Sequence, residues 1–344
     1  MSSATPLLFE IEDKYEIQEI TSNSYIQELI KHVSGYKNGF IRVNPSGFVF
    51  ITETEKYLER LRKFEVRDDD TWICTFPKCG TTWTQEMVWC LMNDLDFKTS
   101  KTIDLDERMI FIDHIAILDD FISVNFPDTI QQAADMPSPR IIKTHLPFDL
   151  LPDQIRMRKK TPKIVHVFRN SRDVCVSHYH HWKILKGFNG GFEMWSRLFL
   201  EGYGGYYSPF WKHVESFYLS QYKNIMFVKY EDMKKDMKIS IEAMCGFLEC
   251  KSYTDDEKTL LQQHLSFKNF KQSPTLNKQT HVKICENVGY SNQDEGAVFV
   301  RKGIVGDWVN YFSDELSEKF QEKDAELSRC TGLVIESQLS NSSL

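Results

Sequence analysis

The chain of 344 residues contains no run of eighteen apolar residues, so we expect no membrane-spanning helix. Its acidic N-terminus lacks a basic segment followed by an apolar stretch, which argues against secretion. The eight cysteines form no C-x-x-C pair, and several of them lie on apolar stretches, which is typical of reduced core thiols. Together these absences predict a cytoplasmic protein that does not associate with membranes.

The chain also lacks an excess of positive charge. Its net charge is −7, whereas a protein that binds a nucleic-acid duplex needs a basic face, so we expect no nucleic-acid partner. Basic residues nevertheless gather at the ends of expected strands and at glycine turns. They are Lys78, Lys143, His145, Arg169, Arg172, Arg301 and Lys302. Cations collected in this way on an acidic protein predict a focused site for a small anion.

Neither an internal repeat nor a low-complexity linker divides the chain, and near-continuous apolar strands alternate with helical patterns along it. The expected strands cover 72–76, 140–143, 163–168 and 224–228, and the expected helices 173–185, 210–222, 239–248 and 255–264. This alternation predicts a single α/β domain with a central parallel sheet flanked by helices. Ligands of such sheets bind beyond the carboxyl ends of the strands, where the candidate cations fall.

The sequence predicts three segments. Residues 1–45 form an amphipathic N-terminal extension that packs on the domain and ends at the turn Asn44-Pro45-Ser46-Gly47. Residues 46–332 form the domain itself, with a less regular span over 95–138. Residues 333–344 form a polar C-terminal tail.

The segment from Thr71 to Leu95 predicts a buried strand, a tight loop that carries Lys78 and Gly80, and a helix that opens at Thr81 and Thr82. The first N–H groups of a helix are unpaired and lie at the positive end of its dipole, so this strand-loop-helix resembles a P-loop and suits a phosphate or sulfate. The nucleoside-triphosphate pattern G-x-x-x-x-G-K-[ST] is absent, because the lysine here precedes a single glycine. Taken alone, the loop could also be a plain turn with a solvated lysine.

A second segment places Lys143 and His145 at the carboxyl end of a strand. A histidine there can act as a general base because its pKa lies near neutral pH. A structural histidine with satisfied hydrogen bonds is the alternative interpretation.

A third segment ends a strand at Arg169 and starts a helix that carries Ser177. Arg169 can hold a phosphate through two parallel hydrogen bonds, and the Ser177 hydroxyl can add another donor. His178, His180 and His181 follow on the same helix, but their spacing does not put three ligands on one face, so we expect no metal there. The fourth segment, Arg301-Lys302-Gly303, suits a loop that lays charge and backbone N–H groups on a phosphate, or else a surface loop.

Taken together, these segments resemble the cytosolic sulfotransferase family over residues 45 to 330, including insect members similar to retinol dehydratase. The family motif T-Y-P-K-S-G-T-T-W corresponds to Thr75 to Trp83, K-T-H-L-P to Lys143 to Pro147, R-N-P-K-D-V-x-V-S to Arg169 to Ser177, Y-E-D-M to Tyr230 to Met233, and R-K-G-x-x-G-D-W to Arg301 to Trp308. None of the alternative interpretations of single segments explains five such matches in order.

The resemblance implies that 3′-phosphoadenosine 5′-phosphosulfate (PAPS) donates a sulfonate group to a hydroxyl or amine of a small acceptor and leaves as PAP. By motif, the loop residues Lys78, Cys79, Gly80, Thr81 and Thr82 would hold the phosphosulfate, and Trp83 would flank the adenine. The 3′-phosphate would contact Arg169, Ser177, Arg301, Lys302 and Gly303. The adenosine would contact Tyr207, Leu265, Ser266 and Phe267.

The same resemblance implies the catalytic roles. His145 would take the proton from the acceptor hydroxyl, and Lys78, helped by Lys143, would stabilise negative charge on the departing oxygen. Protein cations would stand where other enzymes use a metal, so no metal is expected. Two other classes stay open: a nucleotide-binding protein without catalysis, and a small-molecule kinase that uses magnesium.

Two departures from the family pattern have consequences. Cys79 replaces a serine beside a helix N-terminus and Lys78, which predicts a reactive thiolate sensitive to oxidants. In the C-terminal dimer motif, Val309, Ser313 and Asp314 stand where lysine, threonine and valine would be, and Glu318 remains. A homodimer stays open, but the eroded motif argues against the family's usual one.

For the acceptor, we expect an apolar pocket walled by Phe111, Phe148, Tyr179 and His181, together with the span 95–138 and the loop 188–206. A phenol, a steroid-like alcohol or a retinoid would suit it. The resemblance to insect members also leaves open dehydration of the alcohol in place of a stable sulfate ester.

Overall fold

The computed structural model describes residues 15–124, 126–290 and 298–335. The first part of the predicted N-terminal extension, residues 1–14, therefore lies outside the described residues, as does the predicted tail from residue 336 onward. The described end of the chain is not polar: Leu333 and Ile335 are buried in the main hydrophobic cluster.

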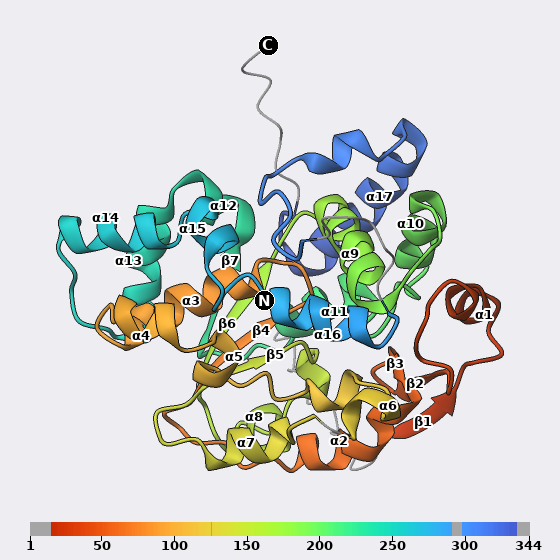
Figure 1. Cartoon of the computed structure of the whole chain (residues 1–344), viewed down its shortest axis with the longest axis horizontal. Coiled ribbons are helices and arrows are strands. Elements are labelled where there is room, and N and C mark those ends of the chain that lie inside the picture. Colours follow the sequence, from red (N-terminus) through yellow and green to blue (C-terminus); the bar gives the residue numbers. More distant parts are fainter. Residues whose placement is uncertain (1–14, 125, 291–297, 336–344) are drawn as a thin grey trace, which may run out of the picture.

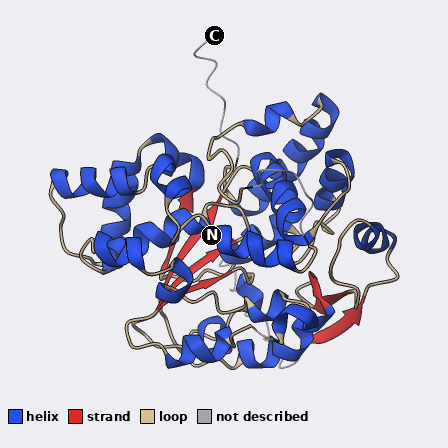
Figure 2. Ribbon diagram, viewed as in Figure 1, coloured by secondary structure: helices blue, strands red, loops and turns tan. Residues whose placement is uncertain are grey.

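A parallel sheet of four strands lies at the centre, as the sequence predicted (Figure 2). In sheet order the strands are β5 (Ile141–Thr144), β4 (Thr71–Thr75), β6 (Lys163–Phe168) and β7 (Ile225–Lys229). Each neighbouring pair is parallel. Because all four carboxyl ends meet at one edge, the residues that follow the strands are brought together.

Two hydrophobic clusters cover the two faces of this sheet. Successive residues of β4 point to opposite faces, so that Trp72 and Cys74 join one cluster and Ile73 joins the other. The Ile73 face packs against α3 (Thr81–Met92), α12 (Tyr230–Lys235), α13 (Met237–Leu248) and α14 (Asp255–His264). The opposite face packs against α9 (Ser171–Lys186), α11 (Phe210–Leu219) and α17 (Asp314–Thr331), and Figure 1 shows these two groups of helices apart. Burial on both faces explains the continuous apolar strands.

The predicted helices are present with small shifts in their ends. The prediction over 255–264 matches α14, and those over 173–185, 210–222 and 239–248 correspond to α9, α11 and α13. Helix α9 begins at Ser171 because the Asn170 side chain accepts hydrogen bonds from the Arg172 and Asp173 N–H groups. It ends at Lys186 because Gly187 takes the left-handed conformation, with φ of 62°.

The N-terminal region forms a second, antiparallel sheet of β1 (Glu16–Glu19), β2 (Phe40–Asn44) and β3 (Phe48–Ile51). The turn predicted at Asn44 to Gly47 joins β2 and β3, and the Gly47 N–H donates to the Val43 carbonyl at 2.6 Å. The pairing of β2 with β3 joins residues on either side of residue 45, the predicted end of the N-terminal extension. The buried residues of the small sheet, Phe40 and Phe50 among them, belong to the main hydrophobic cluster.

The less regular span over 95–138 consists of short helices. They are α4 (Phe97–Thr102), α5 (Leu105–Arg108), η2 (Ile115–Ile117), α6 (Asp120–Ser123) and α7 (Thr129–Asp135). The remaining helices are α1 (Ser24–Lys31), η1 (Thr52–Thr54), α2 (Glu55–Arg62), η3 (Phe148–Leu150), α8 (Asp153–Arg156), α10 (Phe192–Leu200), α15 (Phe267–Gln272), α16 (Gln279–Asn287) and η4 (Asp307–Asn310).

Candidate active site

The carboxyl edge of the central sheet opens into a cavity of about 250 Å³. Segments far apart in the sequence form its wall, because each follows a strand of the sheet or packs over that edge. The predicted site residues that line it are Lys78, Gly80, Thr81, Thr82, Trp83, Phe111, Lys143, His145, Arg169, Ser177, His181, Leu265, Phe267, Arg301, Lys302 and Gly303.

The loop between β4 and α3 presents an uncapped helix N-terminus to this cavity. Gly80 is the N-cap of α3, with φ of 104° and no side chain bonded to the first turn. A Cβ at this position would lie 2.6 Å from the Tyr230 ring, so only glycine fits. Thr81 and Thr82 follow on the cavity wall. The first N–H groups of α3 and these hydroxyls form a site that suits an anion.

Lys78 adds charge to the same loop. Its Nζ lies 3.9 Å from the centroid of the Phe299 ring. Burial, followed by the positive charges of Arg169, Lys143 and Arg301, lowers the pKa of Lys78 to about 7. A cation in such surroundings is stabilised by a negatively charged ligand, which would raise this pKa again.

Arg169, directly after β6, is positioned by backbone groups. Its Nη1 donates to the Lys78 carbonyl at 3.3 Å, and its Nη2 donates to the Ile304 carbonyl at 3.0 Å. The guanidinium also lies 4.3 Å from the centroid of the Tyr230 ring. The Nε atom is buried without a hydrogen-bond partner, but the side chain lines the cavity, where its charge can pair with an anionic ligand.

The segment from Arg301 to Trp308 is fastened to the start of α9. The Asp173 carboxylate accepts hydrogen bonds from the Gly306 N–H at 2.8 Å and from the Trp308 N–H at 3.2 Å. Asp173 therefore positions this segment, and its carboxylate also pairs with Arg169 Nη2 at 3.7 Å. In the same segment, Asp307 pairs with Arg301 at 2.6 Å and with Lys302 at 2.7 Å, so the two cations share one carboxylate.

Aromatic rings form a flat compartment beside these cations. Trp83 donates from Nε1 to the Leu265 carbonyl at 2.9 Å, and its ring meets that of Tyr230 with centroids 5.6 Å apart. Phe267 rests on Gly303, where a Cβ would lie 2.5 Å from the phenylalanine ring. A planar heterocycle suits a compartment walled in this way.

His145 is held in one tautomer by the strand beside it. Its Nδ1 lies 2.7 Å from the Thr75 carbonyl oxygen, which can only accept, so Nδ1 carries the proton. Nε2 is therefore the unprotonated nitrogen of the neutral ring. Burial, followed by the charge of Lys143, lowers the pKa of His145 well below its ordinary value. The ring is thus neutral and able to accept a proton at Nε2 near neutral pH.

Asp113 supports this histidine from the irregular span. Its carboxylate accepts hydrogen bonds from the His145 N–H at 3.3 Å and from the Tyr207 hydroxyl at 2.5 Å. Burial raises the pKa of Asp113. The Tyr207 ring in turn packs on the His145 ring, with centroids 5.6 Å apart.

The part of the cavity beyond His145 is largely apolar. Its wall includes Phe111, Ile117, Leu185 and Tyr206. Lys143 enters it with Nζ 3.8 Å from the centroid of the Phe111 ring, and burial lowers the pKa of Lys143 to about 8. An apolar ligand with one polar end at His145 would suit this compartment.

Two residues predicted to contact adenosine lie away from the cavity wall. Tyr207 is fully buried on Asp113, and its neighbour Tyr206 faces the cavity instead. Ser266 accepts from the Asn269 N–H as the N-cap of α15, between two residues that do line the wall. We therefore assign neither residue as a ligand contact.

Two residues predicted for the acceptor pocket also lie elsewhere. Phe148 packs against Phe217, with ring centroids 5.8 Å apart, and does not line the cavity. The Tyr179 hydroxyl donates to the Gly190 carbonyl at 3.4 Å and does not reach the cavity wall.

The environment of Cys79 corrects the prediction of a thiolate. Its side chain is buried and does not line the cavity. Burial raises the pKa of the Cys79 thiol, and the opposing charge of Arg169 is the smaller effect. The helix N-terminus and Lys78, which the sequence analysis took as decisive, do not overcome the loss of solvation.

Several residues of the wall were not identified from the sequence. Tyr230 and Lys234 follow β7, so the rule that ligands bind beyond strand ends could have found them. Lys186 is the last residue of α9, and a lysine in that position is usually solvated. Asp113 does not line the wall but supports His145, and it is one of several aspartates in the irregular span, so no pattern in the sequence marks it.

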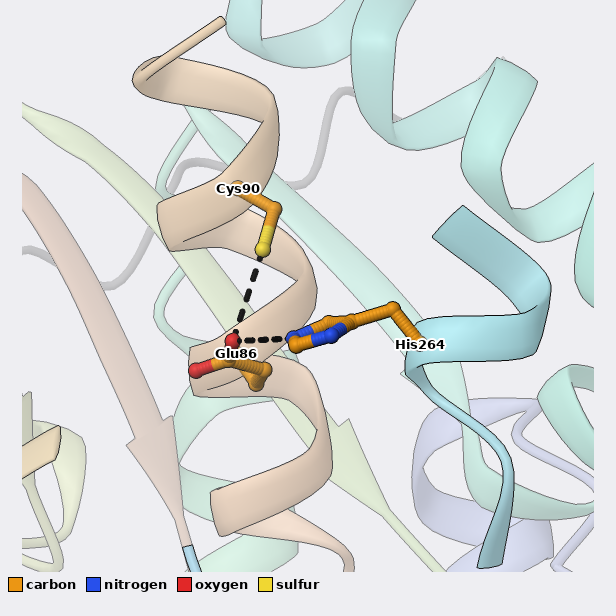
Figure 3. Close-up of side chains that lie close together, drawn as sticks. All are labelled: Glu86, Cys90 and His264. Carbon is orange, nitrogen blue, oxygen red and sulfur yellow. Dashed lines mark hydrogen bonds and ion pairs between the residues drawn. The ribbon is translucent and has the colours of Figure 1, made fainter. Parts of the chain in front are cut away.

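A second cluster of ionisable side chains lies between α3 and the end of α14 (Figure 3). One oxygen of Glu86 accepts from His264 Nε2 at 2.6 Å, from Cys90 at 3.4 Å and from the Ser100 hydroxyl. The other oxygen pairs with Arg108 at 2.7 Å, which already compensates the carboxylate charge. These bonds join α3 to α4, α5 and α14, so we assign the cluster to the scaffold.

The three histidines of α9 point to different neighbours. His178 accepts from Trp182 Nε1 at 3.0 Å, His180 bonds to the Tyr311 hydroxyl at 2.9 Å, and His181 lines the cavity. They do not converge on one point, as expected from their spacing.

In the described ranges, no helix has both the length and the apolar character needed to span a bilayer.

Comparison with known proteins identifies the relatives of this chain. Residues 68–328 match a family model described as the sulfotransferase domain. The luciferin sulfotransferase of Photinus pyralis is 35% identical over 280 residues, which cover 78% of this chain and 74% of that protein. Sulfotransferase 1E1 of Homo sapiens is 32% identical over 282 residues, which cover 80% and 89%.

Solved structures that resemble this chain include those of another enzyme, retinol dehydratase. A crystal structure of retinol dehydratase with androsterone and the inactive cofactor PAP matches with a TM-score of 0.81 at 26% identity and covers 93% of this chain and 97% of that one. A second structure of retinol dehydratase, with retinol and PAP, has the same TM-score and identity and covers 93% and 98%.

Proposed function

The chain belongs to the sulfotransferase family and is a sulfotransferase, and we propose that it transfers a sulfonate group from PAPS to a hydroxyl group of a small, largely apolar acceptor. Retinol dehydratase binds PAP in the two structures described above, which supports PAPS as the donor here. The observation that carries the proposal lies in the cavity itself. Cations surround an uncapped helix N-terminus there, and a neutral histidine with a free Nε2 stands beside them.

The residues present fit such a donor. Lys78, Gly80, Thr81 and Thr82 would hold the phosphosulfate, because N–H groups, hydroxyls and a buried ammonium converge there. Arg169 and the hydroxyl of Ser177, with the Arg301 segment, would hold the 3′-phosphate. Trp83, Leu265 and Phe267 would enclose the adenine.

The chemistry of this chain's own residues follows from charge. PAPS supplies a sulfonate group joined to a good leaving phosphate. His145 would accept the acceptor's hydroxyl proton at Nε2 as the new oxygen–sulfur bond forms and the bond from sulfur to the phosphate oxygen breaks. Lys78 and Lys143 would stabilise the negative charge that develops on the departing oxygen. Asp113 and the Thr75 carbonyl keep the imidazole in place for this step.

The part of the cavity beyond His145 favours an acceptor that carries a hydroxyl group and is otherwise apolar. Phe111, Ile117, Leu185 and Tyr206 provide an apolar and aromatic wall around the space that His145 faces. Androsterone and retinol, which retinol dehydratase binds, have this character. The same relatives leave two products to distinguish, a sulfate ester and a dehydrated alcohol.

The proposal is tested by transfer of labelled sulfonate from PAPS to a panel of phenols, steroids and retinol, with EDTA present. We expect labelled ester, or inorganic sulfate together with a dehydrated product, both of which mass spectrometry identifies. Tight binding of PAP without any transfer would contradict catalysis, and phosphoryl transfer from a nucleoside triphosphate that EDTA abolishes would favour a kinase.

We further propose that the protein acts in the cytoplasm. All eight cysteines are free thiols, which fits a reducing compartment.

A further inference from the structure

Lys186 is a buried lysine that the proposed reaction does not use. It is the last residue of α9, its exposed fraction is 5%, and it lines the cavity. Its Nζ faces the rings of Tyr36 and Tyr206, at 5.1 and 5.5 Å from their centroids. Among the described residues, no carboxylate lies within ion-pair distance of it. Two aromatic faces offset part of the cost of burying the charge but leave its hydrogen bonds unused.

The other cavity cations have assigned partners or tasks, apart from Lys234, which is exposed to solvent. Lys278 pairs with Asp106 at 2.8 Å and with Asp104 at 3.4 Å. Lys302 pairs with Asp307, and Lys78 and Lys143 stand at the reacting group. Lys186 differs from them because it combines burial, a position on the cavity wall and the lack of a described counter-ion.

The geometry of α9 separates Lys186 from the donor. Ser177, His181 and Leu185 line the cavity at every fourth residue, and Lys186 follows at the far end. With a rise of 1.5 Å per residue, Lys186 lies roughly 14 Å along the helix axis from Ser177. Because Lys186 is this far from the proposed 3′-phosphate site, we assign it to the part of the cavity that would hold the acceptor.

The two histidines of the cavity wall near Lys186 are neutral. Burial, followed by nearby positive groups that include Lys186, lowers the pKa of His181 and of His114 well below the ordinary value. Ile117, Leu185 and Tyr206 complete the wall around it. A group that enters this end of the cavity therefore meets the Lys186 ammonium beside neutral imidazoles and apolar side chains, with the Lys278–Asp106 ion pair also on the cavity wall.

We propose that Lys186 binds a carboxylate of the acceptor, so that the preferred substrates are hydroxylated aromatic or apolar acids with the hydroxyl at His145 and the acid at Lys186. This inference rests on the proposed sulfonate transfer. An ion pair formed inside the cavity would satisfy the buried ammonium and would select for acids over neutral analogues.

The test uses matched acceptors of increasing length: a hydroxybenzoic, a hydroxynaphthoic and a hydroxybiphenylcarboxylic acid, each with its two groups at opposite ends, and the methyl ester of each. The measured quantity is the ratio of kcat/KM for an acid to that for its ester. For at least one acid we expect this ratio to fall about 10- to 100-fold in Lys186→Met and to be largely retained in Lys186→Arg.

The matched control is Lys183→Met, the same change on the same helix at a lysine that does not line the cavity. We expect it to leave the ratio at the wild-type value. A ratio that Lys186→Met leaves unchanged, or that Lys183→Met lowers equally, would overturn the inference.

A second readout needs no turnover. Calorimetry measures binding of each acid to the complex of the enzyme with PAP, and PAP affinity itself reports whether Lys186→Met is folded. Weaker acid binding in Lys186→Met supports the inference even if sulfonate transfer fails, whereas equal binding of acid and ester to wild type overturns it while leaving the transfer reaction intact.

Discussion

Lys78 provides a quantitative prediction, because its pKa of about 7 lies far below the ordinary 10.5. The causes are burial first and then the charges of Arg169, Lys143 and Arg301. A bound nucleotide brings negative charge to these cations, so the pKa of Lys78 must rise in the complex. Binding of PAP therefore takes up a proton whenever Lys78 is neutral in the free enzyme.

The expected amount follows from the free-state pKa. At pH 8, about nine-tenths of Lys78 is neutral in the free enzyme, and at pH 6 about one-tenth is neutral. Lys78 should thus contribute uptake of about 0.9 proton at pH 8 and about 0.1 at pH 6. Above pH 7 its contribution to nucleotide affinity should decline by up to about 1.4 kcal/mol per pH unit, until the pKa of the complex is reached.

The assay is calorimetry of PAP binding at both pH values in buffers of different ionisation enthalpy. Lys78→Met is the matched variant, because it removes the titrating ammonium and keeps an apolar side chain of similar length. Burial is the first cause that lowers the pKa of Lys143 to about 8, while the Asp106 and Asp113 carboxylates oppose this shift, so the uptake due to Lys143 is largely common to both proteins. The difference in proton uptake between wild type and variant therefore reports mainly on Lys78. Equal uptake by the two proteins at pH 8 would refute the reasoning.

Other predictions concern the loop and the scaffold. Gly80→Ala should cost about 1–3 kcal/mol of stability and weaken PAP binding, because φ is 104° and the new Cβ meets a tyrosine ring at 2.6 Å; thermal unfolding and calorimetry would detect both. Cys79 should resist iodoacetamide in the native protein while the exposed Cys330 reacts, and rapid labelling of Cys79 in a mass spectrum would contradict its burial. Glu86→Gln should lower the free energy of unfolding by about 3–5 kcal/mol, since it leaves Arg108 buried without a counter-charge, and a denaturant titration that shows no change would count against this role.

The central sheet could be predicted because its buried strands stand out as short apolar segments in the sequence. β4 and β6 are buried along nearly their whole length, and apolar residues therefore dominate their sequences. The carboxyl ends of the strands define one edge of a parallel sheet, and for this reason the sequence alone predicts that Lys143, His145 and Arg169 lie close together. The small N-terminal sheet was missed because β1 and β2 are only 4 and 5 residues long and pair over a long stretch of intervening chain.

The remainder of the site depends on features that sequence patterns do not report. Tyr206 and Tyr207 are adjacent in a turn, and the positive φ of 68° at Tyr207 decides which ring enters the cavity. Burial, not the neighbouring charges, sets the pKa of Cys79. Lys186 belongs to the wall because the chain around α9 encloses the end of that helix, which only the folded structure reveals.

The most direct test of the account is a single-turnover measurement of sulfonate transfer from labelled PAPS by wild type and by His145→Asn, with PAP affinity measured for both. We predict transfer by the wild type and a rate about 10²- to 10⁴-fold lower in the variant, with similar PAP affinity, because only the proton acceptor is lost. Transfer by His145→Asn at the wild-type rate would contradict the role of His145, and the absence of transfer by the wild type to every acceptor tested would contradict the proposed reaction.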